Sequence, residues 1–130
     1  MGNPAIEMAT DASTLGWGAV CNGQSAKGMW SSLEKQKHIN ELKLLAVHFG
    51  LESFLFLLKE KHVCIKSDNS TTVCYLNAMG DTKSPPCNKT AKSVWMCCFQ
   101  NDIWFNACHL PGVLNFEADK SSRQFNERIE

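Results

Sequence analysis

The order of strand-like and helix-like segments is the feature that most constrains how this chain can fold. Three strand-like segments come first, with Asn22-Gly23 as a hairpin turn signal, and helix-like and strand-like segments alternate after them. Expected strands cover residues 6–11, 15–21, 26–32, 62–66 and 103–108, and expected helices cover residues 36–61, 70–79, 88–100 and 116–127. This order predicts an α/β fold, a mixed sheet with helices on its faces.

The size and cysteine pattern predict an intracellular domain. The chain has 130 residues, of which 44% are apolar, and this fits one compact domain over residues 1–130. It shows no signal-peptide pattern and no apolar stretch long enough to span a membrane. The seven cysteines lack zinc-site spacing, and an odd, scattered set argues against a disulfide framework. We expect a monomer with reduced thiols, in the cytoplasm or nucleus, with no membrane partner.

The charge balance bears on nucleic acids as partners. Thirteen basic residues and thirteen acidic residues cancel. A protein that grips nucleic acid alone usually carries a basic excess, because neutralisation of phosphates drives that affinity. If the substrate is a nucleic acid, we therefore expect weak binding by the isolated domain and help from a partner domain.

Four acids stand at the edges of the expected segments: Asp11, Glu41, Asp68 and Asp119. Taken singly, each is more often a turn, cap or solvated helix residue. Converging carboxylates would repel one another and would need divalent cations to stay ionised, and paired Mg²⁺ ions are the usual means of cutting a phosphodiester. Together the acids predict a metal-dependent nuclease. Their repulsion also predicts that Asp68→Asn leaves the melting temperature unchanged or slightly raised.

Three segments carry a resemblance to a known family. They are Thr10-Asp11-Ala12-Ser13 with the following Gly16-Trp17-Gly18-Ala19, then Ser67-Asp68-Asn69, and finally the run from Ala107 to Asp119 that contains His109. Over about residues 6–123 the chain resembles the ribonuclease H domain that follows reverse transcriptase in retroelements. Residues 84–119 look most like retroelements that encode a tyrosine recombinase, the DIRS type, with the gypsy type next. The basic clamp of some family members has no room in residues 80–86.

The resemblance implies a ribonuclease H-like fold, with a five-stranded mixed sheet of three antiparallel strands and then two parallel ones. It implies hydrolysis of the RNA strand of RNA–DNA hybrids, with a reverse transcriptase domain as partner. Asp11, Glu41, Asp68 and Asp119 would hold two Mg²⁺ ions, for which Mn²⁺ substitutes, and His109 would shuttle a proton or aid product release. Expected substrate contacts come from Ser13, Asn69, Ser70 and Arg123.

Two other functions fit parts of the pattern. A DNA-acting nuclease of the same superfold, such as an integrase or transposase core, would lack the His-containing final loop. A catalytically silent or domesticated domain that only binds or tethers would have no physical reason to keep four mutually repelling carboxylates.

Overall fold

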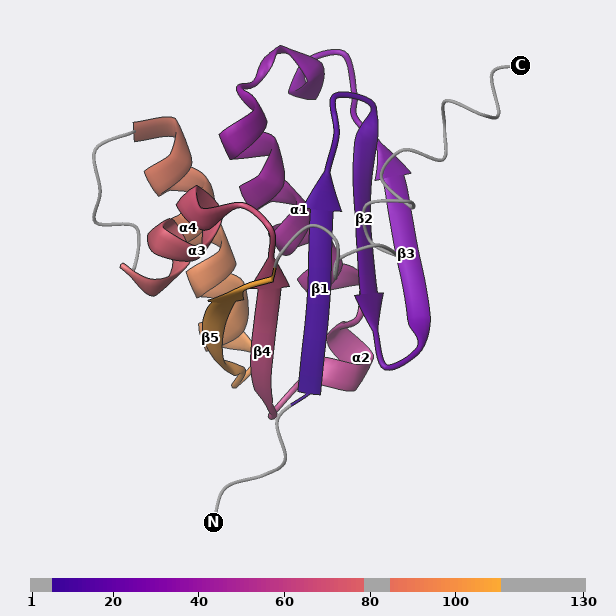
Figure 1. Ribbon diagram of the computed structural model, residues 1–130. Helices are drawn as coiled ribbons and strands as arrows, with labels where there is room; N and C mark the ends of the chain where they lie inside the picture. The colour runs from indigo at the N-terminus through magenta and orange to yellow at the C-terminus, as the bar shows by residue number, and fades with distance from the viewer. Residues whose placement is uncertain (1–5, 79–84, 111–130) are drawn as a thin grey trace.

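A five-stranded mixed sheet forms the centre of the molecule, as the computed structural model shows for residues 6–78 and 85–110 (Figure 1). The strands are β1 (Ile6–Ala12), β2 (Gly16–Cys21), β3 (Gln24–Met29), β4 (His62–Ser67) and β5 (Trp104–His109). Their spatial order is β3-β2-β1-β4-β5; β1, β2 and β3 pair antiparallel, and β4 is parallel to both of its neighbours. The predicted α/β architecture is confirmed.

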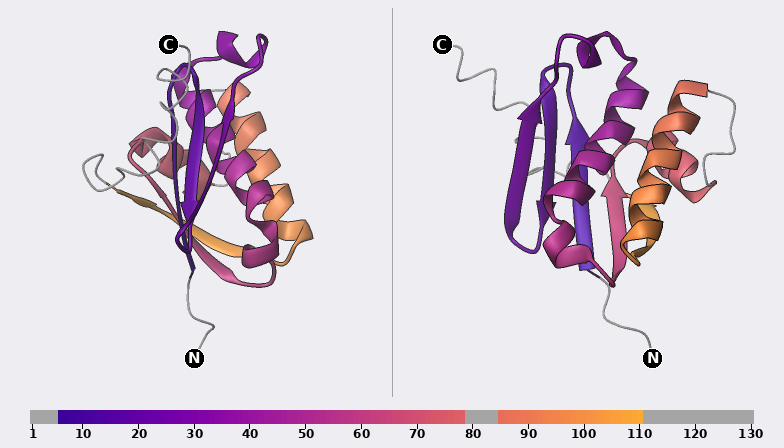
Figure 2. Two further views of the ribbon diagram at one scale, coloured as in Figure 1. Left: turned by 90° about the vertical axis from the view of Figure 1, so that its right-hand side faces the viewer. Right: turned by 180° about the vertical axis from the view of Figure 1, so that it is seen from behind.

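Within residues 6–78 and 85–110, four α-helices and one short 3-10 helix connect the strands. They are the short 3-10 helix η1 (Glu34–Gln36), then α1 (Ile39–Ser53), α2 (Leu55–Leu58), α3 (Ser70–Asn77) and α4 (Pro85–Gln100). The long helices α1 and α4 lie side by side on one face of the sheet, and α3 contacts β4, β5 and α4 (Figure 2). Within the part of the chain that the structure describes, no helix has the length and apolar character to cross a bilayer.

The expected helix over residues 36–61 is shorter and divided in two. It begins at Ile39, because the His38 side chain accepts a hydrogen bond from the Asn40 N–H at 3.1 Å and so caps the first turn. It is interrupted at Phe54 and ends at Leu58. Glu60 then adopts a left-handed conformation with φ of 64°, which turns the chain toward β4, and its N–H donates to the Asn101 carbonyl.

Two other boundaries also differ from the expectation. α4 begins at Pro85 rather than at residue 88, and proline suits a first helical turn because that turn needs no N–H donor there. β5 continues through His109, which was expected in a turn. The expected helix over residues 116–127 lies outside the described residues.

Close packing fixes α1 on the sheet. Val47 is fully buried, and a Cβ added to Gly50 would lie 3.0 Å from the Ala19 Cβ and 3.2 Å from the Met8 sulfur. Gly50 therefore lets the helix approach β1 and β2 more closely than a larger residue would. On the other side, α1 packs against α4, whose Ala91, Val94 and Cys98 are buried. This packing sets the rotation of α1 and hence where its polar side chains point.

Candidate active site

The topology brings Asp11 and Asp68 together. β1 and β4 are adjacent parallel strands, and Thr10 of β1 stands opposite Ser67 of β4. Each aspartate comes one residue later, so both lie at the same edge of the sheet, where the carboxyl ends of parallel strands commonly form ligand sites. Asp11 is buried, with 2% of its surface exposed, and Asp68 is partly buried.

A lysine from α1 bridges the two aspartates. The Lys43 Nζ donates to Asp11 Oδ1 at 2.8 Å and to Asp68 Oδ1 at 3.1 Å. Burial of the ammonium opposes its charged form, but the hydrogen bonds and charge attraction of Asp11 and then Asp68 outweigh it, so the pKa of Lys43 is raised. Lys43 is thus protonated at neutral pH, and its single charge faces both carboxylates.

Glu41 is not part of this cluster. It lies two residues before Lys43, so it points about 200° away around the helix axis. Its Oε2 accepts from Lys37 Nζ at 3.0 Å and from the Thr90 hydroxyl of α4 at 3.5 Å. The structure confirms Glu41 in the first turn of α1, but it places Lys43, not Glu41, beside Asp11 and Asp68.

The helix spacing carried a signal for Lys43 that the sequence reasoning missed. Lys43, Val47 and Gly50 fall at four- and three-residue steps, so they share the stripe of α1 that faces the sheet. Within residues 6–78 and 85–110, no three His, Cys, Asp or Glu side chains are grouped so that they could hold a metal ion. Asp119, the fourth expected ligand, lies outside the described residues.

The expected substrate contacts have local structural roles. Asn69 caps α3, accepting from the Thr72 N–H at 2.7 Å, and its amide donates to Asn40 Oδ1 at 3.2 Å. Ser13 is buried in the β1–β2 turn, where its hydroxyl accepts from the Leu15 N–H at 3.1 Å. Ser70 is exposed at the start of α3. Arg123 lies outside the described residues.

His109 ends β5 next to the aspartates. It stands opposite Ser67 in the β4–β5 pairing, and Ser67 directly precedes Asp68 in the sequence. The His109 side chain is exposed. The neighbouring Leu110 N–H donates to the Ser67 carbonyl at 2.8 Å. The three parallel strand ends therefore carry Asp11, Asp68 and His109 along one edge of the sheet.

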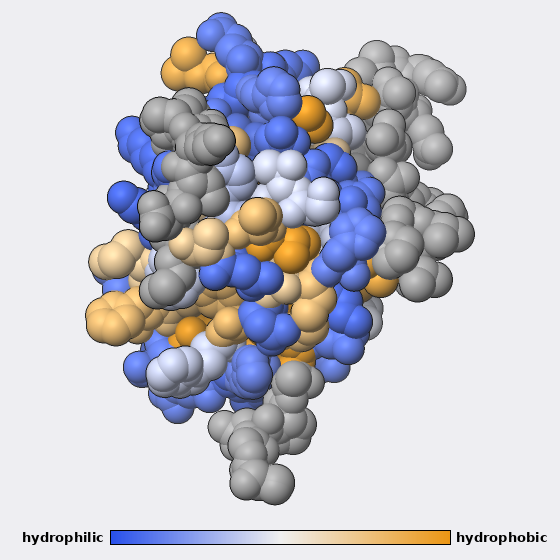
Figure 3. All heavy atoms as spheres, turned by 60° about the vertical axis from the view of Figure 1, so that its left-hand side comes forward, coloured by the Kyte–Doolittle hydropathy of each residue, from blue (hydrophilic) through white to orange (hydrophobic). Residues whose placement is uncertain are grey.

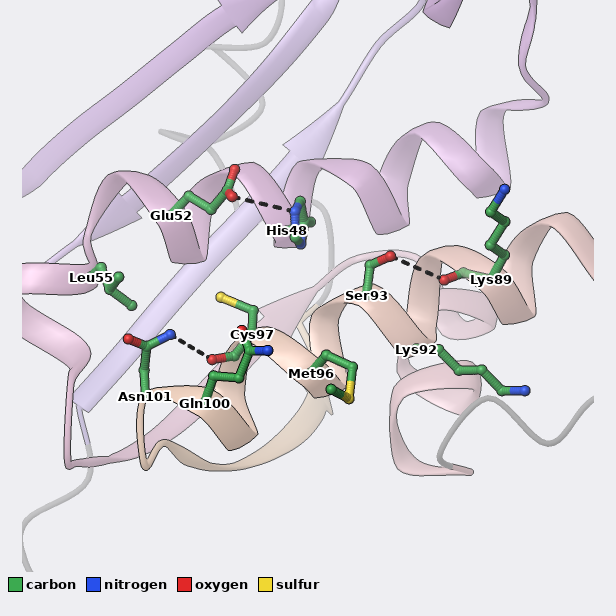
Figure 4. A pocket seen from close by; sticks show the side chains of 10 residues that line it. All are labelled: His48, Glu52, Leu55, Lys89, Lys92, Ser93, Met96, Cys97, Gln100 and Asn101. Atoms are coloured by element: carbon green, nitrogen blue, oxygen red, sulfur yellow. Dashed lines mark hydrogen bonds and ion pairs between the residues drawn. The ribbon is translucent and has the colours of Figure 1, made fainter.

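A separate groove runs between α1 and α4 (Figure 4). Its His48 Nε2 lies 3.5 Å from Glu52 Oε2, and Lys89 and Lys92 of α4 stand on the opposite wall. Neither Asp11 nor Asp68 lines this groove. The surface over the α4 side mixes hydrophilic and apolar patches (Figure 3), and exposed large apolar residues of the described chain include Phe99 and Trp104.

Solved structures decide the fold. The chain superposes on RNase H1 from the halophilic archaeon Halobacterium salinarum with a TM-score of 0.77 and 16% identity, covering 95% of this chain and 99% of that one. LC11-RNase H1, solved in complex with an RNA/DNA hybrid, gives 0.80 and 16% identity, with 96% and 99% covered. The chain has a ribonuclease H fold. Prototype foamy virus protease-reverse transcriptase gives 0.59 and 14% identity, covering 88% of this chain and 16% of that one.

Sequence relatives are viral polyproteins. The chain is 30% identical over 129 residues to the enzymatic polyprotein of figwort mosaic virus (strain DxS), covering 90% of this chain. It is 27% identical over 133 residues to that of cauliflower mosaic virus (strain Strasbourg), covering 91%. The chain spans only 18% and 19% of the length of these relatives. No family model matches it.

Proposed function

We propose that this ribonuclease H-fold domain hydrolyses the RNA strand of RNA–DNA hybrids as one segment of a retroelement polyprotein. The observation that carries the proposal is the convergence of Asp11 and Asp68, whose Oδ1 atoms both lie within 3.1 Å of one cationic nitrogen. A pair of carboxylates that already faces a single cation has the oxygen-rich donor chemistry that Mg²⁺ requires. The fold shared with a hybrid-bound RNase H1 supports the substrate class.

The proposed cation ligands are Asp11, Asp68 and Asp119. When bound there, Mg²⁺ or Mn²⁺ would supply an activated water and would stabilise the leaving oxygen. The four-acid hypothesis also includes Glu41. To bind the cation, the Glu41 carboxylate would have to leave Lys37 and Thr90. His109, exposed at the end of β5, is proposed to carry a proton beside the scissile phosphate.

The remaining proposals concern partners. The formal net charge of zero supports a reverse transcriptase domain of the same polyprotein as the part that grips most of the hybrid. Asn69 and Ser70, at the start of α3 beside Asp68, are proposed to contact the 2′-hydroxyl side of the RNA strand. The pattern of residues 84–119 favours a tyrosine-recombinase retroelement as the source, with the gypsy type second.

A second candidate function is favoured by one specific observation, the Lys43 bridge. An ammonium that contacts both aspartates offsets part of the repulsion that would otherwise demand a metal ion. A domain built this way would bind a hybrid, or hold the polymerase in place, without cutting. Under this hypothesis Asp11 and Asp68 are structural partners of Lys43.

One assay separates the two functions. An end-labelled RNA strand is presented in an RNA–DNA hybrid and in duplex RNA, and an end-labelled duplex DNA serves as the control. Each substrate is incubated with Mg²⁺, Mn²⁺ or EDTA. The nuclease proposal predicts metal-dependent cutting of the hybrid RNA alone, lost in Asp11→Asn. Hybrid binding, measured by fluorescence anisotropy, without any cutting by excess protein at millimolar Mn²⁺ would contradict it and support the silent domain.

A further inference from the structure

The Asp11–Lys43–Asp68 cluster joins three elements through one nitrogen. Lys43 comes from α1, Asp11 from β1, and Asp68 from the residue that follows β4. The side chains are 16%, 1% and 22% exposed, so water screens their charges only weakly. The cluster is therefore a built cation site whose occupant belongs to the chain itself.

A divalent cation and the Lys43 ammonium cannot share this place. Both are drawn to the same two carboxylate oxygens, and like charges at such short range repel strongly where water is scarce. The lysine is nevertheless not locked in, since its ammonium is a point charge on a flexible four-carbon stem and part of the side chain reaches solvent. A divalent cation can therefore replace the Lys43 ammonium without unfolding of the domain.

We propose that Lys43 is an internal counter-ion that holds Asp11 and Asp68 together in the absence of metal, and that a divalent cation binds there only as the ammonium withdraws. The inference rests on the proposed cation-binding role of the two aspartates, but not on any cleavage reaction. Its consequence is that Lys43 weakens metal binding, so its removal strengthens binding at the same two carboxylates.

The test is Mn²⁺ binding by the folded domain, followed by electron paramagnetic resonance of the free ion. The variants are Lys43→Met, which removes the charge at similar volume, and Lys43→Gln, which keeps a donor for the aspartates. Lys35→Met, on the exposed surface of η1, is the control for the loss of one positive charge. We expect the Mn²⁺ dissociation constant to fall about tenfold or more in both Lys43 variants, and to stay within about twofold in Lys35→Met.

The double variant Lys43→Met with Asp11→Asn locates the effect. It should lose the increase in Mn²⁺ affinity seen in Lys43→Met, because one of the two carboxylates is gone. If Lys43→Met does not fold in EDTA, refolding on addition of Mn²⁺ gives the same answer, and Lys43→Gln carries the titration. Unchanged or weaker Mn²⁺ binding in folded Lys43 variants would overturn the inference.

Cleavage is scored separately, so that the two proposals fail in different ways. Tighter Mn²⁺ binding by Lys43→Met without cutting of the hybrid by any variant keeps the counter-ion role and rejects the nuclease. Cutting by the natural chain with no change in Mn²⁺ affinity on removal of Lys43 keeps the nuclease and rejects the counter-ion role.

Discussion

Two charged clusters lie two residues apart on α1, and they differ in almost every physical respect. Glu41 pairs with Lys37, four residues earlier and just before α1 begins, and the side chains are 11% and 38% exposed. Lys43 instead pairs with Asp11 and Asp68, which are 32 and 25 residues distant in sequence, and the Asp11 side chain is 1% exposed. The first pair is local in sequence, and the second cluster exists only because the sheet and the helix are packed together.

The difference teaches that helix phase, not sequence proximity, decides which charge enters a site. A pair whose lysine reaches solvent, as Lys37 does, contributes about 0–1 kcal/mol, whereas loss of one partner from a buried pair costs about 3–5 kcal/mol. The Lys43 cluster should therefore govern both the stability and the cation chemistry of this edge of the sheet, while Glu41 should have little influence on either.

Lys43→Met should have the largest effect. Without divalent cations it should lower the free energy of unfolding by about 3 kcal/mol, because the buried Asp11 and the partly buried Asp68 are left facing each other without a counter-charge. Urea denaturation in EDTA measures this, with Lys37→Met as the matched control, which should cost less than about 1 kcal/mol. Equal losses of unfolding free energy in Lys43→Met and Lys37→Met would contradict the difference drawn between the two clusters. Addition of Mn²⁺ should restore part of the loss only in Lys43→Met.

Asp11→Asn and Asp68→Asn should have intermediate effects. Each removes the negative charge of one acceptor of Lys43 and so weakens that hydrogen bond, and each should lower the unfolding free energy by about 1–3 kcal/mol, more for the buried Asp11 than for Asp68. This reverses the expectation from carboxylate repulsion alone, in which Asp68→Asn is neutral or stabilising. A higher melting temperature of Asp68→Asn in EDTA would show that repulsion outweighs the lysine bridge.

Glu41→Gln should have a small effect. Glutamine keeps an oxygen acceptor for Lys37 and Thr90, and Lys37 reaches solvent, so the change should cost less than about 1 kcal/mol and leave Mn²⁺ affinity and hybrid cleavage unchanged. Parallel Mn²⁺ titrations of Glu41→Gln and Asp11→Asn give the sharpest contrast between the clusters. Loss of Mn²⁺ binding in Glu41→Gln would restore it as a metal ligand.

Cys98→Ala tests a buried core thiol that belongs to neither charged cluster. It should change the pH dependence of stability above pH 8 and not at neutral pH. Burial raises the pKa of the Cys98 thiol from 9.0 to about 12. The unfolded thiol loses its proton first, so stability should fall as the pH rises from about 9 toward 12 and should not change on this account below pH 8. Thermal melts of Cys98→Ala between pH 8 and 10 should show a shallower fall than those of the natural chain. An unchanged slope would assign the fall to other groups.

The architecture could be predicted from the sequence because it depends on local signals. Strand patterns and the Asn22-Gly23 turn signal each act within a few residues, and the structure confirms the sheet. The interruption at Phe54 could not be predicted in the same way, because it serves the turn through Glu60, whose N–H bonds to Asn101 in a distant loop.

The site could be predicted only in part. Asp11 and Asp68 lie together as expected, because they stand at the carboxyl ends of strands that are parallel neighbours. Glu41 lies near the start of its helix, as the four-acid hypothesis expects, but that position does not specify the direction of the side chain around the helix. The packing of α1 against the sheet, with Gly50 close to Met8 and Ala19, and against α4 fixes its rotation and turns Lys43 toward the aspartates.

A crystal structure of the natural chain soaked in Mn²⁺, with anomalous diffraction data, tests most directly whether this edge of the sheet is a cation site. We predict an anomalous peak between Asp11 and Asp68, with the Lys43 ammonium moved away from both oxygens. A peak at Glu41, or a fully occupied Lys43 bridge beside a metal-free pair of aspartates at saturating Mn²⁺, would contradict the proposal.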